Sequence, residues 1–443
     1  MLSKQEAQKL AEKVMSFAKL PECRVFVTSS ENVFIRFANN GITTSGYQVS
    51  HTVGIASTTE DKRSGNASVT ELTDDALRRG VEQAEMLAKI SKPSPEDMPP
   101  LGPQKYPEIA NFDSGTAEAR GENMIGHVKA IIDEARSRKL TAAGFVQRGA
   151  SWTAVANKAG LFGYHPHTDA SLSNTMRNSG GTSSGWATQV STTIKDLNGA
   201  AAAKISADKC VRGENKQRLE PGKYTVILEP AAVSDLIGFI SFFGRSAEQG
   251  QSWLSKKGGK PGETLLGEKV FPEYITLRSD PFNPKLTAAP WGPGLLPHEK
   301  VTWIENGVVK NLFYDRFWAQ KAGKKPTAGS GSLVLEGQDH TLADLIKSAD
   351  KAILVTRLWY MRILQPQTLQ VTGTTRDGVF LVEKGEITQP LMNFRWNESP
   401  VRVLQNTKML AQPVVTQGAE TGASLAPALM ATDFNFASIS DAV

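Results

Sequence analysis

The six histidines are the residues of this chain best suited to metal chemistry. They are His51, His127, His165, His167, His298 and His340. A zinc hydrolase needs two or three zinc ligands and a carboxylate that activates the bound water, and one helix commonly supplies two histidines four residues apart. No two of the six histidines have that spacing. The sequence therefore offers no helical histidine pair for hydrolytic zinc.

His298 and Glu299 begin like a helical zinc motif but do not complete it. Thr302 stands where the second histidine would be, and Pro297 favours a loop or the start of a strand. A chance dipeptide is the preferred interpretation over a metal site.

His165, His167 and Asp169 alternate along the chain. On a regular strand all three would share one face and could hold a divalent ion. Pro166 lies between them and favours an edge or irregular segment, so we prefer a polar surface segment. An independent metal-dependent hydrolase built on these residues is the alternative.

Other catalytic templates are missing from the sequence. It contains no phosphate-binding G-x-x-x-x-G-K followed by Ser or Thr, and no cysteine near a histidine. Nucleotide hydrolysis and catalysis by a cysteine nucleophile therefore have no motif support.

Arginines and aromatic residues interleave with β-type residues between Thr356 and Asp377. Arg357, Tyr360, Arg362 and Arg376 are the candidate substrate-binding residues, because such a surface could grip a peptide. The preferred alternative is a sheet strand whose arginines pair with carboxylates. No basic stripe or recognised helix motif surrounds the segment, so a nucleic-acid site is not favoured.

The overall composition indicates a globular protein of two or three domains. The chain has 443 residues, of which 40% are hydrophobic and 21% charged, and its formal charge is only +5. Its two cysteines, Cys23 and Cys210, are far apart, as expected where thiols stay reduced. The amphipathic start carries lysines and glutamates and lacks the apolar run of a signal peptide. We expect a cytoplasmic protein with no membrane span.

Residues 1–215 are expected to form one α+β domain with an internal duplication. Ser3 and Glu6 predict a capped first helix, and strands follow on both sides of the turn Asn39-Asn40-Gly41. A turn is expected at Gly65, a helix over 73–90, and a proline-rich linker near 91–112. A helix over 122–139 then begins the same order again, with Gly185 corresponding to Gly65.

Residues 216–443 are expected to form a strand-rich domain. It begins with a strand over 224–228 and a helical run over 231–243. Asn306-Gly307 and Lys384-Gly385 predict hairpin turns, and a capped helix over 341–348 precedes a buried strand over 352–356. The whole chain is thus predicted to have an α+β fold, with a mixed C-terminal domain.

Several segments together resemble the TldD/PmbA family, once called modulators of DNA gyrase. The similar segments lie at residues 33–42, 153–161, 228–230 and 377–387, where the last reads Asp-Gly-Val-Phe-Leu-Val-Glu-Lys-Gly-Glu-Ile. The resemblance covers nearly the whole chain, and its specificity comes from the order and spacing of these segments.

The resemblance implies a particular kind of subunit. In the TldD type, an HExxxH motif lies on the helix that follows a strand like 224–228, and a glycine-flanked cysteine motif comes late in the chain. This sequence has no histidine between His167 and His298 and no cysteine after Cys210, so it resembles the TldE/PmbA type. No catalytic residue can be carried over.

The same resemblance implies a partner and a substrate class. We expect a non-catalytic subunit that pairs with a zinc-holding TldD-type subunit, or forms a homodimer, and helps to enclose a chamber for unfolded peptides. No cofactor is expected in this chain, and neither nucleic acid nor membrane is an expected partner. A stand-alone binding or regulatory protein, acting for example on DNA gyrase, is the alternative from another class.

Overall fold

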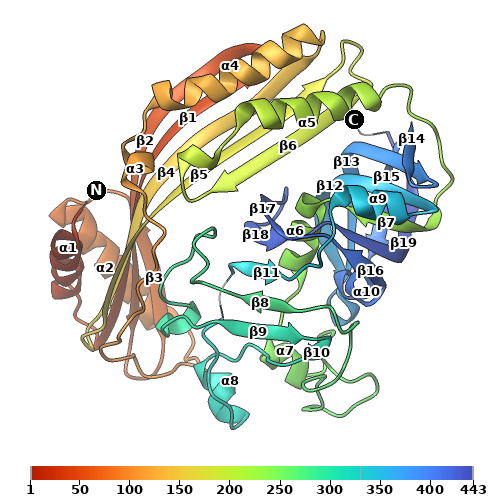
Figure 1. Cartoon of the computed structure of the whole chain (residues 1–443). Coiled ribbons are helices and arrows are strands. Elements are labelled where there is room, and N and C mark those ends of the chain that lie inside the picture. Colours follow the sequence, from red (N-terminus) through yellow and green to blue (C-terminus); the bar gives the residue numbers. More distant parts are fainter. Residues whose placement is uncertain (1, 330, 442–443) are drawn as a thin grey trace.

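The computed structural model describes residues 2–329 and 331–441, and its strands form three sheets. The first sheet has the order β3-β2-β1-β4-β5-β6 and is antiparallel throughout. Its strands are β1 (Glu22–Ala38), β2 (Gly41–Thr58), β3 (Ser64–Val69), β4 (Thr141–Asn157), β5 (Phe162–Arg177) and β6 (Ser184–Ser191). Figure 1 shows its long strands curving around the C-terminal half of the chain.

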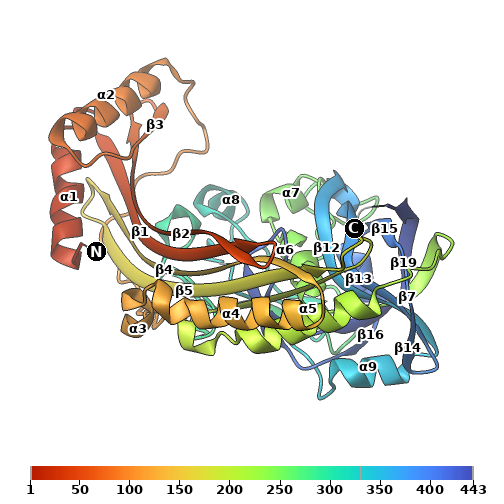
Figure 2. The same ribbon diagram turned by 90° about the horizontal axis from the view of Figure 1, so that it is seen from above.

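The helices of the first half pack against one face of this sheet. They are α1 (Lys4–Ser16), α2 (Asp74–Ile90), α3 (Ser114–Glu118), α4 (Gly121–Ser137) and α5 (Gly199–Arg212). One buried cluster joins α1 and α2 to the sheet, and a second joins α4 and α5. Figure 2 shows these two pairs of helices at different ends of the long strands. The order helix, three strands, helix therefore occurs twice in the sequence and is repeated across the sheet.

Local signals account for several of these elements. Ser3 and Glu6 form the reciprocal capping box that begins α1, as predicted. Asn39 and Asn40 both have positive φ angles, 51° and 56°, and connect β1 to β2 in the hairpin that their sequence indicates.

The predicted turn at Gly65 is wrong, because Gly65 lies inside β3. A Cβ atom at this position would overlap the backbone of Ala84 in α2. Gly185 has the corresponding place in β6, where a Cβ would overlap the carbonyl oxygen of Ser206 in α5. Both glycines thus allow a helix to approach the sheet closely, and neither forms a turn.

The second half of the chain forms two further sheets. One has the order β10-β9-β8-β11-β18-β17, and the other β12-β7-β19-β15-β13-β14, with β16 paired to β19. Because β12 also pairs with β13, the strands β12, β7, β19, β15 and β13 close into a ring. The bounds are β7 (Gly222–Leu228), β8 (Leu277–Ser279), β9 (Val301–Glu305), β10 (Val308–Val309), β11 (Leu333–Leu335), β12 (Lys351–Gln365), β13 (Gln370–Glu383), β14 (Glu386–Pro390), β15 (Asn393–Glu398), β16 (Thr407–Leu410), β17 (Val414–Gln417), β18 (Ala423–Ala426) and β19 (Leu429–Ser440).

Five short α-helices lie among the described residues of this half. They are α6 (Pro230–Phe239), α7 (Gly244–Glu248), α8 (Arg316–Lys321), α9 (Leu342–Ser348) and α10 (Pro400–Gln405). The helix predicted over 231–243 thus ends four residues early, and Phe242 and Phe243 lie beyond it. The α+β prediction for the whole chain is confirmed. None of the helices among the described residues is long and apolar enough to span a membrane.

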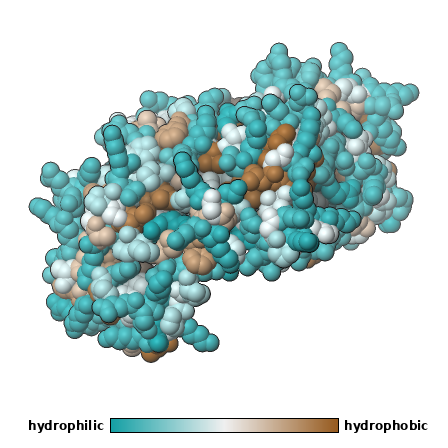
Figure 3. Space-filling view, turned by 90° about the horizontal axis from the view of Figure 1, so that it is seen from below, coloured by the Kyte–Doolittle hydropathy of each residue, from teal (hydrophilic) through white to brown (hydrophobic). Residues whose placement is uncertain are grey.

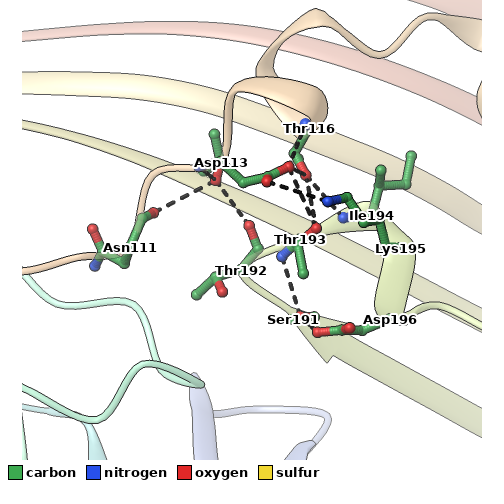
Figure 4. Close-up of polar contacts among 10 residues, drawn as sticks. Asn111, Asp113, Thr116, Ser191, Thr192, Thr193, Ile194, Lys195 and Asp196 are labelled. Carbon is green, nitrogen blue, oxygen red and sulfur yellow. Dashed lines mark hydrogen bonds and ion pairs between the residues drawn. The ribbon is translucent and has the colours of Figure 1, made fainter.

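A network of polar contacts fixes the end of the segment 92–113, which contains no helix or strand (Figure 4). Asp113 caps α3 by accepting hydrogen bonds from Thr116 N and Thr116 Oγ1, at 2.6 and 2.7 Å. Thr116 Oγ1 in turn accepts one from Ile194 N, beyond β6. Thr168 of β5 donates to Thr192 O and accepts from Asp113 N. These contacts attach the segment to the edge of the first sheet.

The connection between β8 and β9 joins the two halves of the chain. Tyr106 donates a hydrogen bond to Leu295 O and its ring lies 5.1 Å from that of Trp291. Asn111 donates to Ala288 O, and Thr192 donates to Pro284 O. Residues 284–295 therefore lie against the face of the first sheet that carries no helices.

Candidate functional site

The helix α6 carries a buried carboxylate. It occupies the place after β7 where the resemblance would locate a zinc-binding helix. It follows β7 directly, with Pro230 in its first turn. Asp235, on this helix, is 0% exposed. Its Oδ2 accepts a hydrogen bond from Ala419 N at 2.9 Å, and its Oδ1 accepts from Glu420 N and from Thr421 Oγ1. Burial raises the pKa of Asp235, while these hydrogen bonds oppose the rise.

Through this carboxylate, α6 fixes the loop between β17 and β18 against β12. Glu420, in that loop, accepts a hydrogen bond from Tyr360 N at 2.8 Å. It also pairs with the guanidinium of Arg362 at 3.3 Å. Asp235 thus positions Glu420, and Glu420 positions the exposed residues of β12.

The residues of α6 do not fit a zinc ion. The helix contains no histidine or cysteine, and both oxygens of Asp235 already accept hydrogen bonds from the loop. Among residues 2–329 and 331–441, no three His, Cys, Asp or Glu side chains are grouped so that they could hold a metal ion.

Arg357 is buried between the first sheet and the ring of strands. Its Nε donates to Asp377 Oδ2 at 2.7 Å, and its NH2 contacts the same oxygen. The guanidinium lies 4.6 Å from the ring centroid of Trp186 in β6 and 5.2 Å from that of Trp359. Burial lowers the pKa of Arg357, and the neighbouring carboxylate opposes this. These contacts match the preferred alternative for this residue, an arginine paired with a carboxylate inside a sheet.

The other three predicted binding residues lie near Arg357 in β12 and β13 but differ in exposure. Arg376 lies over the ring of Trp359 at 5.4 Å, and its Nε is 3.9 Å from Asp377 Oδ2. Tyr360 is 58% exposed, and Arg362 lies over its ring at 4.4 Å. The structure therefore separates a buried Arg357 from an exposed pair, Tyr360 and Arg362, which a peptide could reach.

His165 and His167 lie on a regular strand, β5, and their rings stack with centroids 5.8 Å apart. The preference for a polar surface segment is wrong for His165, which is 4% exposed, because residues 284–295 cover this face. Burial lowers the pKa of His165 to about 4 and also lowers that of His167, whereas burial raises the pKa of Asp169. Pro166 pairs with Trp152 of β4 and lies where β6 does not reach, so the expectation of an edge holds.

An aromatic cavity of about 600 Å³ opens beyond the C-terminal end of α6. The aromatic residues that line it are Phe242, Phe243, Trp291, Trp303 and Phe313. Figure 3 shows patches of apolar side chains in an otherwise largely hydrophilic face of the molecule. Sequence reasoning missed this cavity, since its aromatic residues come from four separate segments and share no spacing.

His298 lies in the wall of this cavity and has a structural contact. Its Nδ1 is 2.6 Å from Ala289 O, which makes this nitrogen the donor. The ring is buried, and burial lowers its pKa, whereas Glu299 is exposed. The pair lies in the irregular segment before β9, in agreement with the interpretation of a chance dipeptide.

Two models of known protein families match this sequence. Residues 221–438 match the model of the PmbA/TldA metallopeptidase C-terminal domain, and residues 23–88 match that of PmbA/TldA metallopeptidase domain 1. No curated protein matches the sequence.

Solved structures of similar fold cover almost the whole chain. TldE from Thermococcus kodakarensis has a TM-score of 0.83 at 20% identity, over 97% of this chain and 99% of that one. A proposed modulator of a DNA gyrase from Thermotoga maritima has a TM-score of 0.82 at 17% identity, over 96% and 99%. One from Bacteroides thetaiotaomicron also scores 0.82, at 20% identity, over 99% and 100%. Together with the two family models, which span more than half of the sequence, these similarities show that the chain belongs to the TldD/PmbA family of metallopeptidase-like proteins.

Proposed function

We propose that this chain is the non-catalytic subunit of a two-chain zinc metallopeptidase of the TldD/TldE type, which processes unfolded peptides. The observation that carries the proposal is the chemistry of α6. The resemblance stated above assigns zinc to the helix after the strand that is β7 here. In this chain that helix has no histidine, and its Asp235 is fully buried and engaged by residues 419–421.

In this proposal the chain contributes shape and contacts, and zinc belongs to the partner subunit. Asp235 holds the loop that carries Glu420, and Glu420 holds Tyr360 N and the Arg362 guanidinium. An aromatic ring stacked under a guanidinium, both exposed, suits contact with an extended peptide of variable sequence. The role of this chain is thus to line the peptide path and bind the partner.

Reconstitution tests the proposal directly. The chain is produced alone, together with a TldD-type subunit from the same organism, and in a mixture of the two purified subunits, and each sample is given an unstructured peptide. We expect stable co-purification and hydrolysis only where both subunits are present. Hydrolysis by this chain alone would contradict the assignment, as would a partner subunit that is equally active without it.

A matched variant separates the proposed roles in the complex. Asp235→Asn keeps the size of the side chain but leaves one hydrogen-bond acceptor where two N–H groups and a hydroxyl donate. We expect the complex to keep its zinc content and lose part of its affinity for peptide. If zinc is lost from the complex in proportion to activity, α6 takes part in metal binding and the proposal is wrong.

A further inference from the structure

The aromatic cavity beyond α6 is held in shape by contacts among its own rings. Phe242 stacks on Trp303 with ring centroids 5.0 Å apart. Phe243 meets Phe313 edge to face at 5.7 Å. Backbone hydrogen bonds fix this arrangement, since Phe313 N donates to Phe242 O at 2.7 Å and Gly244 N donates to Phe313 O at 2.8 Å. The cavity therefore presents ring faces and edges in fixed positions, against which another ring can pack.

The lining of the cavity suits an uncharged group. None of its described lining residues is charged, so a charged ligand group would find no partner there. The indole N–H of Trp303 is already used, because it donates to Ser279 Oγ at 2.9 Å. Phe243, another lining residue, is 55% exposed. Covering this ring with an apolar group removes apolar surface from water and so favours binding.

One polar atom of the lining residues has no partner. His298 is 9% exposed, and its Nε2 makes no hydrogen bond with the described part of the chain. Because Nδ1 donates to Ala289 O and burial lowers the pKa of the ring, Nε2 is an acceptor at neutral pH. The carbonyl of Gly329 also opposes the fall in pKa but forms no hydrogen bond with Nε2. A Cβ atom at the lining residue Gly292 would lie 2.7 Å from Nε2, so glycine leaves room there for a donor.

One helix and one loop connect the cavity to the exposed pair Tyr360 and Arg362. Gly238 of α6 lies in the cavity wall, and a Cβ atom there would overlap the side chain of Thr421. The preceding residue, Glu420, accepts the hydrogen bond from Tyr360 N and pairs with Arg362. The cavity is therefore placed to receive a side chain of a peptide that contacts the exposed pair.

We propose that the cavity binds the side chain of a tyrosine in the unfolded peptide, with the hydroxyl donating to His298 Nε2. This inference rests on the proposed peptide-binding role and deepens it by naming a preferred side chain. Tyrosine combines a ring, no charge and a donor at its end, which match the aromatic walls, the uncharged lining and the free acceptor. Phenylalanine would leave Nε2 unpaired, and an aliphatic side chain would also lose the packing between rings.

Binding to the chain alone tests the inference without hydrolysis. Three blocked peptides, Gly-Gly-X-Gly-Gly with tyrosine, phenylalanine or alanine at X, are titrated with the full chain and followed by NMR. We expect the tyrosine peptide to bind about fivefold more tightly than the phenylalanine peptide, which gains no hydrogen bond. The phenylalanine peptide should bind about tenfold more tightly than the alanine peptide, because its ring is buried.

Two variants assign the preference to His298. His298→Asn keeps an amide N–H on the side of Ala289 O but has no acceptor in the place of Nε2. Gly292→Ala, at an ordinary φ of −96°, places a methyl group against Nε2. Both variants should bind the tyrosine and phenylalanine peptides equally. Gly126→Ala is the control, because a Cβ there meets nothing within 4 Å and the residue lies on α4. It should keep the preference.

Several results would overturn the inference. These are equal binding of the tyrosine and phenylalanine peptides by the wild type, a preference that both variants keep, and binding of free p-cresol without binding of the tyrosine peptide. The reconstituted complex separates this inference from the proposed function. Hydrolysis that needs both subunits but shows no preference for tyrosine contradicts only the cavity assignment. Tyrosine-selective binding by this chain, with no hydrolysis by the complex, supports the cavity and contradicts the proposed function.

Discussion

The guanidinium of Arg357 lies 4.6 Å from the ring of Trp186, although the two residues belong to different sheets. Trp186 comes from β6, at the end of the first sheet, and Arg357 from β12 in the ring of strands. Asp377, 1% exposed, neutralises the arginine from the other side. This contact joins the two halves of the chain through a charge that is removed from water. Its loss should therefore lower the free energy of unfolding.

Arg357→Ala is expected to lower the free energy of unfolding by about 3–5 kcal/mol, because it leaves the carboxylate of Asp377 buried without its partner. Arg362→Ala is the control, since Arg362 pairs with Glu420 at a side-chain exposure of 57% and should cost less than about 1 kcal/mol. Urea unfolding of both variants measures the difference. Equal effects would show that Arg357 has no special role between the sheets.

The peptide path is tested on the three candidate binding residues other than the buried Arg357. Tyr360→Ala, Arg362→Ala and Arg376→Ala in the reconstituted complex are each expected to raise KM for an unstructured peptide, up to about tenfold where a full contact is lost. Arg79→Ala, on the exposed face of α2, should leave KM unchanged and serves as the control. If KM and kcat stay at wild-type values in all three variants, these residues do not line the path.

The sequence predicts those features that depend on neighbouring residues. The capping box of Ser3 and Glu6, the hairpin turn at Asn39 and Asn40, and the α+β class all follow from local chemistry and are confirmed. Gly65 shows the limit of this reasoning. Its tripeptide is typical of a turn, but the approach of α2 requires a glycine inside a strand.

The candidate site shows the same limit over longer distances. The sequence of β12 and β13 indicates interleaved arginines and aromatics, but it cannot show that Trp186 covers Arg357. Nor does any spacing connect Asp235 with the loop at 419–421, almost two hundred residues later. Burial of His165 depends in the same way on residues 284–295. Such contacts arise only when separate segments pack together.

Burial of His165 predicts a loss of stability in mild acid. Its pKa is lowered from 6.5 to about 4, so the folded state holds the neutral ring more strongly than the unfolded chain does. The stability from this group is therefore complete above pH 6.5 and is lost as the pH falls toward 4. We expect the wild type to lose about 2 kcal/mol more than His165→Gln between pH 7.5 and 5.

Urea titrations of both proteins at several pH values measure this difference. If His165→Gln keeps the pH dependence of the wild type, the acid sensitivity comes from other groups.

The close approach of helices to the first sheet can be tested at its glycines. Gly65→Ala places a Cβ atom into the backbone of α2, so we expect the free energy of unfolding to fall by about 3 kcal/mol or more. Gly185→Ala should lower the free energy of unfolding by a similar amount if α5 packs against β6 as α2 packs against β3. Gly126→Ala is the control, because a Cβ there meets nothing within 4 Å and removes a glycine from inside α4, which should stabilise the protein by up to about 1 kcal/mol. Thermal and urea unfolding distinguish these signs, and a neutral Gly65→Ala would show that β3 and α2 are not in close contact.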